Sequence, residues 1–430
     1  MAKIQDKDRR YSLLRFYVDF MFKTAYRRVA YYGKEKIPQK GAIIYAPNHT
    51  NTLMDALAVL AIDRKEKVFV SRADIFKNPL VLKFLTFLKM LPINRKRDGV
   101  ENLAKNEEVN NIVVDALHDQ VPFCILPEGT HRTMHSLMPL QKGLFRIALQ
   151  ANDTFGNEIP VYIVPVGIEF GHFFRYRSSL LVQIGDPIDV TQYVRHHSYL
   201  TIPVQITCLK NELSERIKEL ILHIPDDTQY QATKELSQLC QKERQSAKNR
   251  LIDRFAAAKE TIQEVASLLD SDPQKVLPLL NAADDFSRQR EALGIGMASV
   301  LKTHLCWTIF GRVLFLFLGL PLFVASAVAT SLVTLPSMWL CSKFKDNAFH
   351  NTVRFLVALA LLPLILLIAG PTIALLCSWM WGVLFALLLL PSFLFLHEYI
   401  RWFRLFVSDV KYITNRDLYK KFNQIKSLKL

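Results

Sequence analysis

Two long stretches without charged side chains limit what this chain can fold into. Between residues 307 and 340 the only charged side chain is Arg312, and between residues 355 and 396 there is none. Both stretches exceed the roughly 20 apolar residues that cross a bilayer core as a helix. The alternative is a pair of buried core helices in a large soluble protein, but uncharged runs of this length are not typical of one. The sequence therefore predicts an integral membrane protein.

Each apolar stretch contains a place where the chain could reverse. Gly370-Pro371 lies near the middle of the second stretch, and Gly319-Leu320-Pro321 lies within the first. Gly and Pro favour turns, and the cationic residues that follow both stretches belong on the cytoplasmic face by the positive-inside rule. We therefore expect two hairpins with three to four spans over residues 306–400. The first ten residues are too highly charged for a cleavable signal, so the rest of the chain is expected on the cytoplasmic face.

Positive charge is concentrated at the two ends of the chain. Residues 1–40 hold eleven Lys and Arg against four acids (+7), and residues 401–430 hold eight against two (+6), out of a net +15. Basic ends beside apolar segments indicate contact with anionic lipid headgroups rather than with nucleic acid. Aromatic and basic side chains are interleaved over residues 11–32, which predicts a helical interfacial anchor. The alternative is an aromatic helix docked on the rest of the protein. Residues 401–430 are expected to form a basic cytoplasmic tail.

Residues 41–190 alternate between β-rich and helical patterns, which predicts an α/β domain. The predicted strands are 42–46, 67–71, 122–126, 161–164 and 180–184, and the predicted helices are 52–62, 77–90, 100–118 and 142–151. Residues 191–305 change to helical spacing and are rich in Lys, Glu, Gln and Ala. We expect them to form a helical arm or insertion before the membrane hairpins.

The six cysteines are scattered, with no C-x-x-C pair. This usage indicates a reducing compartment and no structural zinc site. His131 and His135 are four residues apart, but no helix is predicted there and a third local ligand is missing. We therefore expect no bound metal. Cys124 lies in a predicted strand and is interpreted as a small buried apolar residue.

A histidine and a carboxylate follow the first predicted strand. His49 precedes Asp55 by six positions, so in a continuous helix the two would point about 240° apart. They can meet only if His49 lies in the loop and Asp55 on the first helical turn. The carboxylate could then fix the imidazole tautomer and leave the other ring nitrogen to take a proton. The alternative is a simple capping box from Thr52 to Asp55.

Two further stretches could bind a phosphate. Pro127-Glu128-Gly129-Thr130 follows a predicted strand, and Lys142-Gly143 opens a predicted helix, where free amide groups suit an anion. Arg95-Lys96-Arg97 is a run of three cations after a short apolar stretch. It could grip a phosphate or be a solvated turn.

Taken together, these blocks resemble the glycerolipid acyltransferase family, of the PlsC-like type. Asn48-His49 through Asp55 is similar to its catalytic histidine-aspartate block, and Ile93-Asn94-Arg95 to its second block. Pro127 to Thr130 is similar to the third block and Val164 to Ile168 to the fourth. All four occur in the family order across residues 41–188.

Two features depart from the common family pattern. The family usually has four residues between the histidine and the aspartate, whereas five separate His49 from Asp55. Fungal-type membrane glycerol-3-phosphate and dihydroxyacetone-phosphate acyltransferases share the longer spacing. The chain also resembles them in residues 137–143, 174–178 and 184–187 and in its C-terminal apolar hairpins. The third block commonly has Arg directly after Thr, whereas here His131 follows Thr130 and Arg132 comes next.

The resemblance implies an α/β acyltransferase domain with a mixed sheet flanked by helices. It implies that His49, oriented by Asp55, removes the proton from a glycerol hydroxyl as the hydroxyl attacks an acyl thioester. Arg95 would bind the acceptor phosphate. The substrate-binding residues that it implies are Asn48, Arg95, Lys96, Glu128, Gly129, Thr130, Arg132 and Lys142.

These implications lead to a membrane-bound glycerol-3-phosphate O-acyltransferase of phospholipid synthesis, with glycerone phosphate as a further acceptor. Acyl-CoA or acyl carrier protein would be the co-substrate, with no other cofactor, and anionic lipids the surface partner. One alternative is a 1-acylglycerol-3-phosphate O-acyltransferase, which would need an apolar slot, for example along residues 80–91. Another is a non-catalytic lipid-binding membrane protein. The chain lacks G-x-S-x-G, a P-loop and G-x-G-x-x-G, which excludes serine-hydrolase, NTPase and Rossmann sites.

Overall fold

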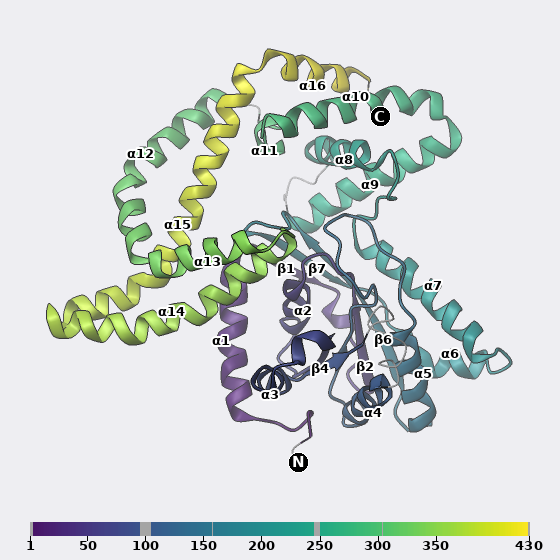
Figure 1. The fold of residues 1–430 in the computed structure, drawn as a ribbon. Coiled ribbons are helices and arrows are strands. Elements are labelled where there is room, and N and C mark those ends of the chain that lie inside the picture. Colours follow the sequence, from purple (N-terminus) through teal and green to yellow (C-terminus); the bar gives the residue numbers. More distant parts are fainter. Residues whose placement is uncertain (1–2, 95–104, 157, 245–249, 303, 429–430) are drawn as a thin grey trace. The chain divides into compact units, whose positions relative to one another are not determined.

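The computed structural model describes residues 3–94, 105–156, 158–244, 250–302 and 304–428 (Figure 1). Two compact units make up the structure. The first consists of Met1–Ile221 with Phe344–Phe355, and the second of Leu222–Lys343 with Leu356–Leu430. The first unit therefore extends beyond residue 190, where the sequence predicted the end of the α/β domain.

A mixed sheet forms the centre of the first unit. Its strands lie in the order β1-β7-β6-β2-β5-β3-β4, and β8 pairs with β6. Strand β2 is parallel to its neighbours β5 and β6, whereas β6 is antiparallel to β7 and β8. This confirms the predicted mixed α/β fold. The strands are β1 (Tyr26–Tyr32), β2 (Ala42–Pro47), β3 (Val68–Arg72), β4 (Met90–Ile93), β5 (Phe123–Cys124), β6 (Val161–Phe170), β7 (Ser178–Ile184) and β8 (Ile188–Asp189).

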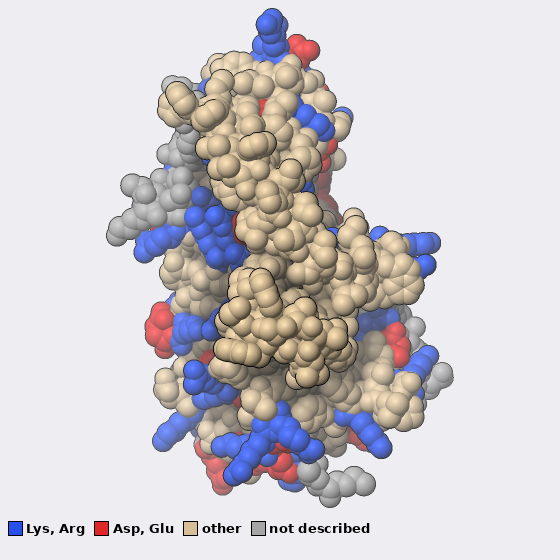
Figure 2. Space-filling model, turned by 90° about the vertical axis from the view of Figure 1, so that its left-hand side faces the viewer, with Lys and Arg blue, Asp and Glu red and all other residues tan. Residues whose placement is uncertain are grey.

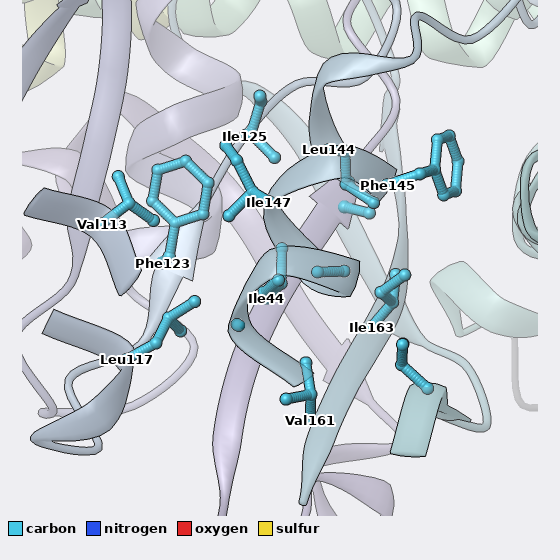
Figure 3. Packing of buried hydrophobic residues seen from close by; sticks show 14 of the residues in the cluster. Ile44, Val113, Leu117, Phe123, Ile125, Leu144, Phe145, Ile147, Val161 and Ile163 are labelled. Carbon is cyan, nitrogen blue, oxygen red and sulfur yellow. The ribbon is translucent and has the colours of Figure 1, made fainter. Parts of the chain in front are cut away.

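Helices flank the sheet and close an apolar core. Figure 3 shows Phe123 of β5 and Ile163 of β6 among side chains of the covering helices α4 and α5, in one buried cluster. Burying such side chains stabilises the fold by about 25 cal/mol per Å² of apolar surface. The helices of this unit are α1 (Arg9–Ala25), α2 (Leu53–Leu60), α3 (Pro79–Phe87), α4 (Lys105–His118), α5 (Gly143–Phe155), α6 (Val190–His196) and α7 (Ile202–Leu220), with the 3-10 turns η1 (Lys34–Lys36) and η2 (Ala73–Phe76).

The predicted N-terminal helix is wrong in its second half. Helix α1 ends at Ala25, and Tyr26–Tyr32 forms strand β1, parallel to β7. Aromatic and β-branched residues fit a pleated surface, and pairing with β7 satisfies their backbone groups. Phe22 of α1 is buried, as the docked-helix alternative expects, whereas Leu13 and Phe16 are 74% and 71% exposed, and the interfacial anchor stays a prediction.

The predicted helical arm begins too early. Helix α7 packs on β6 in the first unit, and the two backbones approach closely at Gly167. A Cβ atom there would lie 2.3 Å from the carbonyl oxygen of Leu220, so only glycine fits. Residues 191–220 are therefore part of the α/β unit. Only the later helices of the predicted arm belong to the second unit.

A helical bundle forms one part of the second unit. Its helices are α8 (Tyr230–Arg244), α9 (Leu251–Ser271), α10 (Pro273–Ala292), α11 (Met297–Val300) and α16 (Arg416–Leu428). Leu418 and Ile425 of α16 are buried in the bundle core, so the basic C-terminal segment is not a separate tail. Arg290 and Glu235 form a buried ion pair between α10 and α8, at 2.5 Å and 2.7 Å.

Four apolar helices form the rest of the second unit. They are α12 (Leu305–Ala329), α13 (Ser331–Lys343), α14 (Ala348–Leu376), whose first turns belong to the first unit, and α15 (Trp379–Thr414). Among the described residues, α12, α14 and α15 are long and apolar enough to cross a membrane. On the face shown in Figure 2, the surface of these helices is almost free of charged atoms.

Both predicted membrane turns are wrong in position. Helix α12 continues through Pro321 to Ala329, and α14 continues through Gly370-Pro371 to Leu376. The second reversal instead lies at Cys377-Ser378, between α14 and α15. Within an apolar solvent a helix satisfies more backbone groups than an open turn, so Pro is tolerated inside it.

Candidate active site

The structure brings His49 and Asp55 together. Strand β2 ends at Pro47 and α2 begins at Leu53, so His49 lies in the loop and Asp55 in the first helical turn. The His49 Nδ1 and Asp55 Oδ2 atoms are 2.8 Å apart. With Nδ1–H donating to the carboxylate, the ring presents Nε2 as a proton acceptor. This is the arrangement that the loop-plus-helix interpretation required, rather than a capping box alone.

Buried hydrogen bonds fix the Asp55 carboxylate. The side chain is 0% exposed, and Oδ2 also accepts hydrogen bonds from the backbone N–H groups of Thr50 (2.9 Å) and Asn51 (2.7 Å). The His49 side chain remains 15% exposed. A rigid buried acid therefore orients a base that substrate can still reach.

Glu128 connects the third block to the histidine loop. Its Oε1 accepts a hydrogen bond from the His49 backbone N–H at 2.6 Å, and its Oε2 accepts one from the Met138 N–H at 2.9 Å. Burial raises the pKa of the Glu128 carboxyl to about 7, against the opposing effect of these two N–H groups. Glu128 therefore organises the loops around His49 through the backbone.

Of the other predicted site residues, Asn48 and Arg132 form hydrogen bonds around the His49 loop, whereas Lys142 is exposed to solvent. The Asn48 amide donates to the Ile168 carbonyl (3.1 Å) and accepts from the Ile168 N–H (2.7 Å), which joins the first and fourth blocks. The Arg132 backbone N–H donates to the His49 carbonyl at 3.2 Å. The Lys142 side chain is exposed just before α5.

Gly129 and Thr130 lie in the turn that follows Glu128. Gly129 has a φ of +69°, a left-handed conformation that favours glycine. Thr130 is half-buried. Arg95 and Lys96 lie outside the described residues.

Sequence reasoning missed the polar partners that come from distant segments. Asn51 Nδ2 donates to the Phe173 carbonyl at 2.8 Å. His131, considered in the sequence only as a metal ligand and as a departure from the family pattern, pairs with Asp346 at 2.9 Å, and its ring centroid lies 5.6 Å from that of His49. No local pattern links residues 131 and 346, so the sequence held no signal for this contact.

Neither a metal centre nor a thiol nucleophile emerges from the described part of the chain. No group of three or more His, Cys, Asp or Glu side chains within it could hold a metal ion. Cys124 is fully buried in β5, and burial raises the pKa of its thiol above the ordinary range. The His49–Asp55 pair combines a fully buried carboxylate with a partly exposed ring, which suits proton transfer.

Residues 28–169 match the family model described as Acyltransferase. The chain carries an acyltransferase-family domain. All the described residues of the His49 loop and the third block fall inside this match. This match confirms the acyltransferase domain that the four blocks predicted.

Over 66 residues the chain is 36% identical to glycerol-3-phosphate O-acyltransferase 1 of Saccharomyces cerevisiae (strain ATCC 204508 / S288c). The matched stretch covers 15% of this chain and 9% of the yeast protein, so the chain spans about a tenth of the length of this relative.

A solved structure, the 1-acyl-sn-glycerophosphate acyltransferase PlsC from Thermotoga maritima, is also similar. It shares 19% identity and a TM-score of 0.35, over 50% of this chain and 81% of that chain.

Proposed function

We propose that this chain is a membrane-bound glycerol-3-phosphate O-acyltransferase that uses His49 as general base. The observation that carries the proposal is the 2.8 Å contact between His49 Nδ1 and a fully buried Asp55 carboxylate. Such a contact orients the imidazole and leaves Nε2 for the acceptor hydroxyl. The four blocks in family order support the acyl-transfer chemistry.

The proposed reaction is a direct transfer. His49 Nε2 takes the proton of the acceptor hydroxyl while the hydroxyl oxygen attacks the thioester carbonyl carbon. The carbon–sulfur bond then breaks, the ester forms, and the thiolate recovers the proton from the imidazolium. No acyl-enzyme forms, and no cofactor beyond the acyl-CoA or acyl carrier protein donor takes part. Much of the rate enhancement would come from holding both substrates in line.

Glycerol 3-phosphate is the acceptor that the resemblances favour. The five-residue interval between His49 and Asp55 is that of fungal-type glycerol-3-phosphate and dihydroxyacetone-phosphate acyltransferases, and the matched yeast relative is named for glycerol 3-phosphate. We propose glycerone phosphate as a further acceptor. Arg95 and Lys96, with Arg132 and Lys142, are the proposed phosphate contacts.

A second acceptor is favoured by one observation. Helix α3 exposes Leu80 (76%) and Phe84 (55%) on the same unit as His49. An apolar face of this kind could accept the acyl chain of 1-acylglycerol 3-phosphate, whose acylation would give phosphatidate. The same face suits a lipid surface, so product analysis decides between the two acceptors.

The membrane arrangement that we propose is a pair of hairpins entering from the catalytic side. Among the described residues, no candidate span precedes α12, and Phe344–Phe355 belongs to the catalytic unit. Helix α13 has 13 residues and is not a candidate span, so α12 and α13 would return to the same side as a re-entrant hairpin. Helix α15 leads to α16, which packs on α10, so α14 and α15 also enter and return. The lysines and arginines after each hairpin support the cytoplasmic face for this side.

The test is product identification by mass spectrometry. Purified protein in anionic lipid is given labelled acyl donor with glycerol 3-phosphate, glycerone phosphate or 1-acylglycerol 3-phosphate. We expect lysophosphatidate from the first acceptor, and none from His49→Ala. His118→Ala, an exposed histidine at the end of α4, is the matched control. Turnover only with the 1-acyl acceptor would support the second candidate. No product from any acceptor, with retained lipid binding, would support a non-catalytic protein.

A further inference from the structure

A short segment between two apolar helices belongs to the catalytic unit. Phe344–Phe355, here called the interspan segment, consists of the link that follows α13 and the first two turns of α14. The sequence showed it only as a cationic link between the two apolar stretches. In the structure it contacts the loops that carry His49 and His131.

The first contact is at a strained residue between His49 and Asp55. Thr52 has φ +47° and ψ −121°, a conformation that normally requires glycine and is a clear outlier for a β-branched side chain. Such backbone strain costs on the order of 1–3 kcal/mol and persists only where the surroundings hold it. Thr52 lies in the interval that is one residue longer than is usual for the family. The turn at Thr52 lies in the stretch that connects His49 to Asp55, whose side chains meet at 2.8 Å.

The interspan segment holds the side chain of this strained residue. Thr52 Oγ1 and Thr352 Oγ1 are 2.6 Å apart, and Thr352 is buried. A hydroxyl pair of this length is a short hydrogen bond, and Thr52 Oγ1 also lies 3.5 Å from the Ala348 carbonyl oxygen of the same segment. Thr352 therefore stabilises the backbone conformation that places Asp55 under His49.

The second contact is at the third block. Asp346 Oδ2 lies 2.9 Å from His131 Nε2, and the ring of Phe349 packs edge-on against His131 at 5.3 Å. Burial acts to raise the pKa of Asp346, but the Ala348 N–H and His131 outweigh it, so the pKa is lowered. The ionised Asp346 carboxylate holds the His131 ring through its contact with Nε2. The His131 ring lies next to the ring of His49.

A third contact attaches the same segment to the loop between β6 and β7. Arg354 Nη1 donates to the Phe174 carbonyl at 2.7 Å. Phe173, the residue before, accepts from Asn51 Nδ2 at 2.8 Å. The interspan segment thus reaches the histidine loop directly at Thr52 and indirectly through residues 173–174.

We propose that the interspan segment is a clamp on the acyltransferase site, in which Thr352 positions the His49–Asp55 loop and Asp346 positions His131. His131 stands where the related third block commonly has arginine, so we assign it to contact with the polar head of the acceptor. The clamp rests on the proposed acyltransferase function. It makes the link between two membrane hairpins a part of the site, so the α/β domain without residues 344–355 is incomplete.

The test separates the two positioning roles. Thr352→Val removes the hydroxyl at nearly constant shape, and we expect kcat to fall about tenfold with little change in the donor KM, because the base is displaced. Thr352→Ser keeps the hydroxyl and should restore kcat. Thr372→Val makes the same change in the same helix, at a threonine that bonds within that helix, and should behave as wild type.

Asp346→Asn tests the second role. We expect the acceptor KM to rise about tenfold with kcat nearly unchanged, whereas Lys345→Ala, at the exposed neighbouring residue, should change neither. In a double-mutant cycle, Asp346→Asn should have no further effect in the His131→Gln background. Wild-type kinetics in both Thr352→Val and Asp346→Asn, or full additivity with His131→Gln, would overturn the clamp.

A measurement without turnover keeps the clamp separate from the proposed function. The N–H groups of Thr50 and Asn51 are protected by Asp55, so hydrogen exchange over residues 49–55 reports on the loop. We expect exchange over these residues to be about tenfold faster in Thr352→Val than in wild type and unchanged in Thr372→Val. Unchanged exchange would overturn the clamp even in an active enzyme. Faster exchange in a protein that makes no product would support the clamp and reject the acyltransferase.

Discussion

The two units use buried acids in different ways. In the α/β unit, Asp55 and Glu128 bind loop backbone and a histidine that stays partly exposed. In the helical unit, Glu235 and Asp409 pair with arginines that are themselves buried, Arg290 and Arg312, and the second pair joins α15 to α12. An acid in the first setting positions a reactive group, whereas an acid in the second holds helices together. The comparison teaches that burial of a charge does not by itself mark an active site.

The largest effect should come from the acid that orients the base. Asp55→Asn offers an amide where the His49 Nδ1–H and two backbone N–H groups need a carboxylate, so we expect kcat to fall about 10³-fold. Asp153→Asn, an exposed position on α5, is the matched control. Steady-state kinetics with glycerol 3-phosphate would check this. If kcat fell by less than about tenfold, Asp55 would not differ in role from the acids that hold the helices together.

Breaking the buried pair of the helical bundle should instead lower stability. Arg290→Met leaves Glu235 buried without its cation, which typically costs about 3–5 kcal/mol. The double variant Arg290→Met with Glu235→Leu should recover much of that loss, and Arg288→Met, at an exposed neighbour, should be neutral. Denaturant unfolding in detergent measures all three. If Arg290→Met lowered kcat with unchanged stability, the bundle would have a role in catalysis.

Glu128 predicts a pH dependence of stability. Its pKa is raised from 4.5 to about 7, first by burial. A carboxyl with a higher pKa in the folded chain contributes stability that is full below the unfolded pKa and is lost as pH rises through the folded pKa. We expect wild type to lose up to about 3 kcal/mol relative to Glu128→Gln between about pH 4.5 and pH 8. A pH-independent difference in unfolding free energy would show that the two N–H groups keep Glu128 ionised throughout.

Arg95→Ala should give the smallest effect. Removing a ground-state phosphate contact is expected to raise the acceptor KM about tenfold and to leave kcat unchanged. Lys142→Ala, in the same assay, ranks the two proposed phosphate contacts. An unchanged KM with a lowered kcat would place Arg95 in the transition state instead.

Local sequence patterns were sufficient to predict those strands and helices whose composition alone indicates burial. The short β-rich runs at β2, β6 and β7 predicted strands, and the long uncharged runs predicted apolar helices, because apolar composition and run length report burial. The same approach failed at β1 and at the hairpin turns. There the outcome depended on a partner strand and on the apolar surroundings, which tertiary contacts supply.

The sequence by itself determined the mixed α/β domain, the presence of apolar helices and the residues able to move a proton, His49 and Asp55. Only the tertiary structure decided that Thr52 is strained, that Thr352 holds it, and that Asp346 faces His131 across 215 positions of sequence. The physical reason is that hydrogen bonds between distant segments have no periodicity. Which hydroxyl or carboxylate satisfies a given donor is fixed only when the chain has folded.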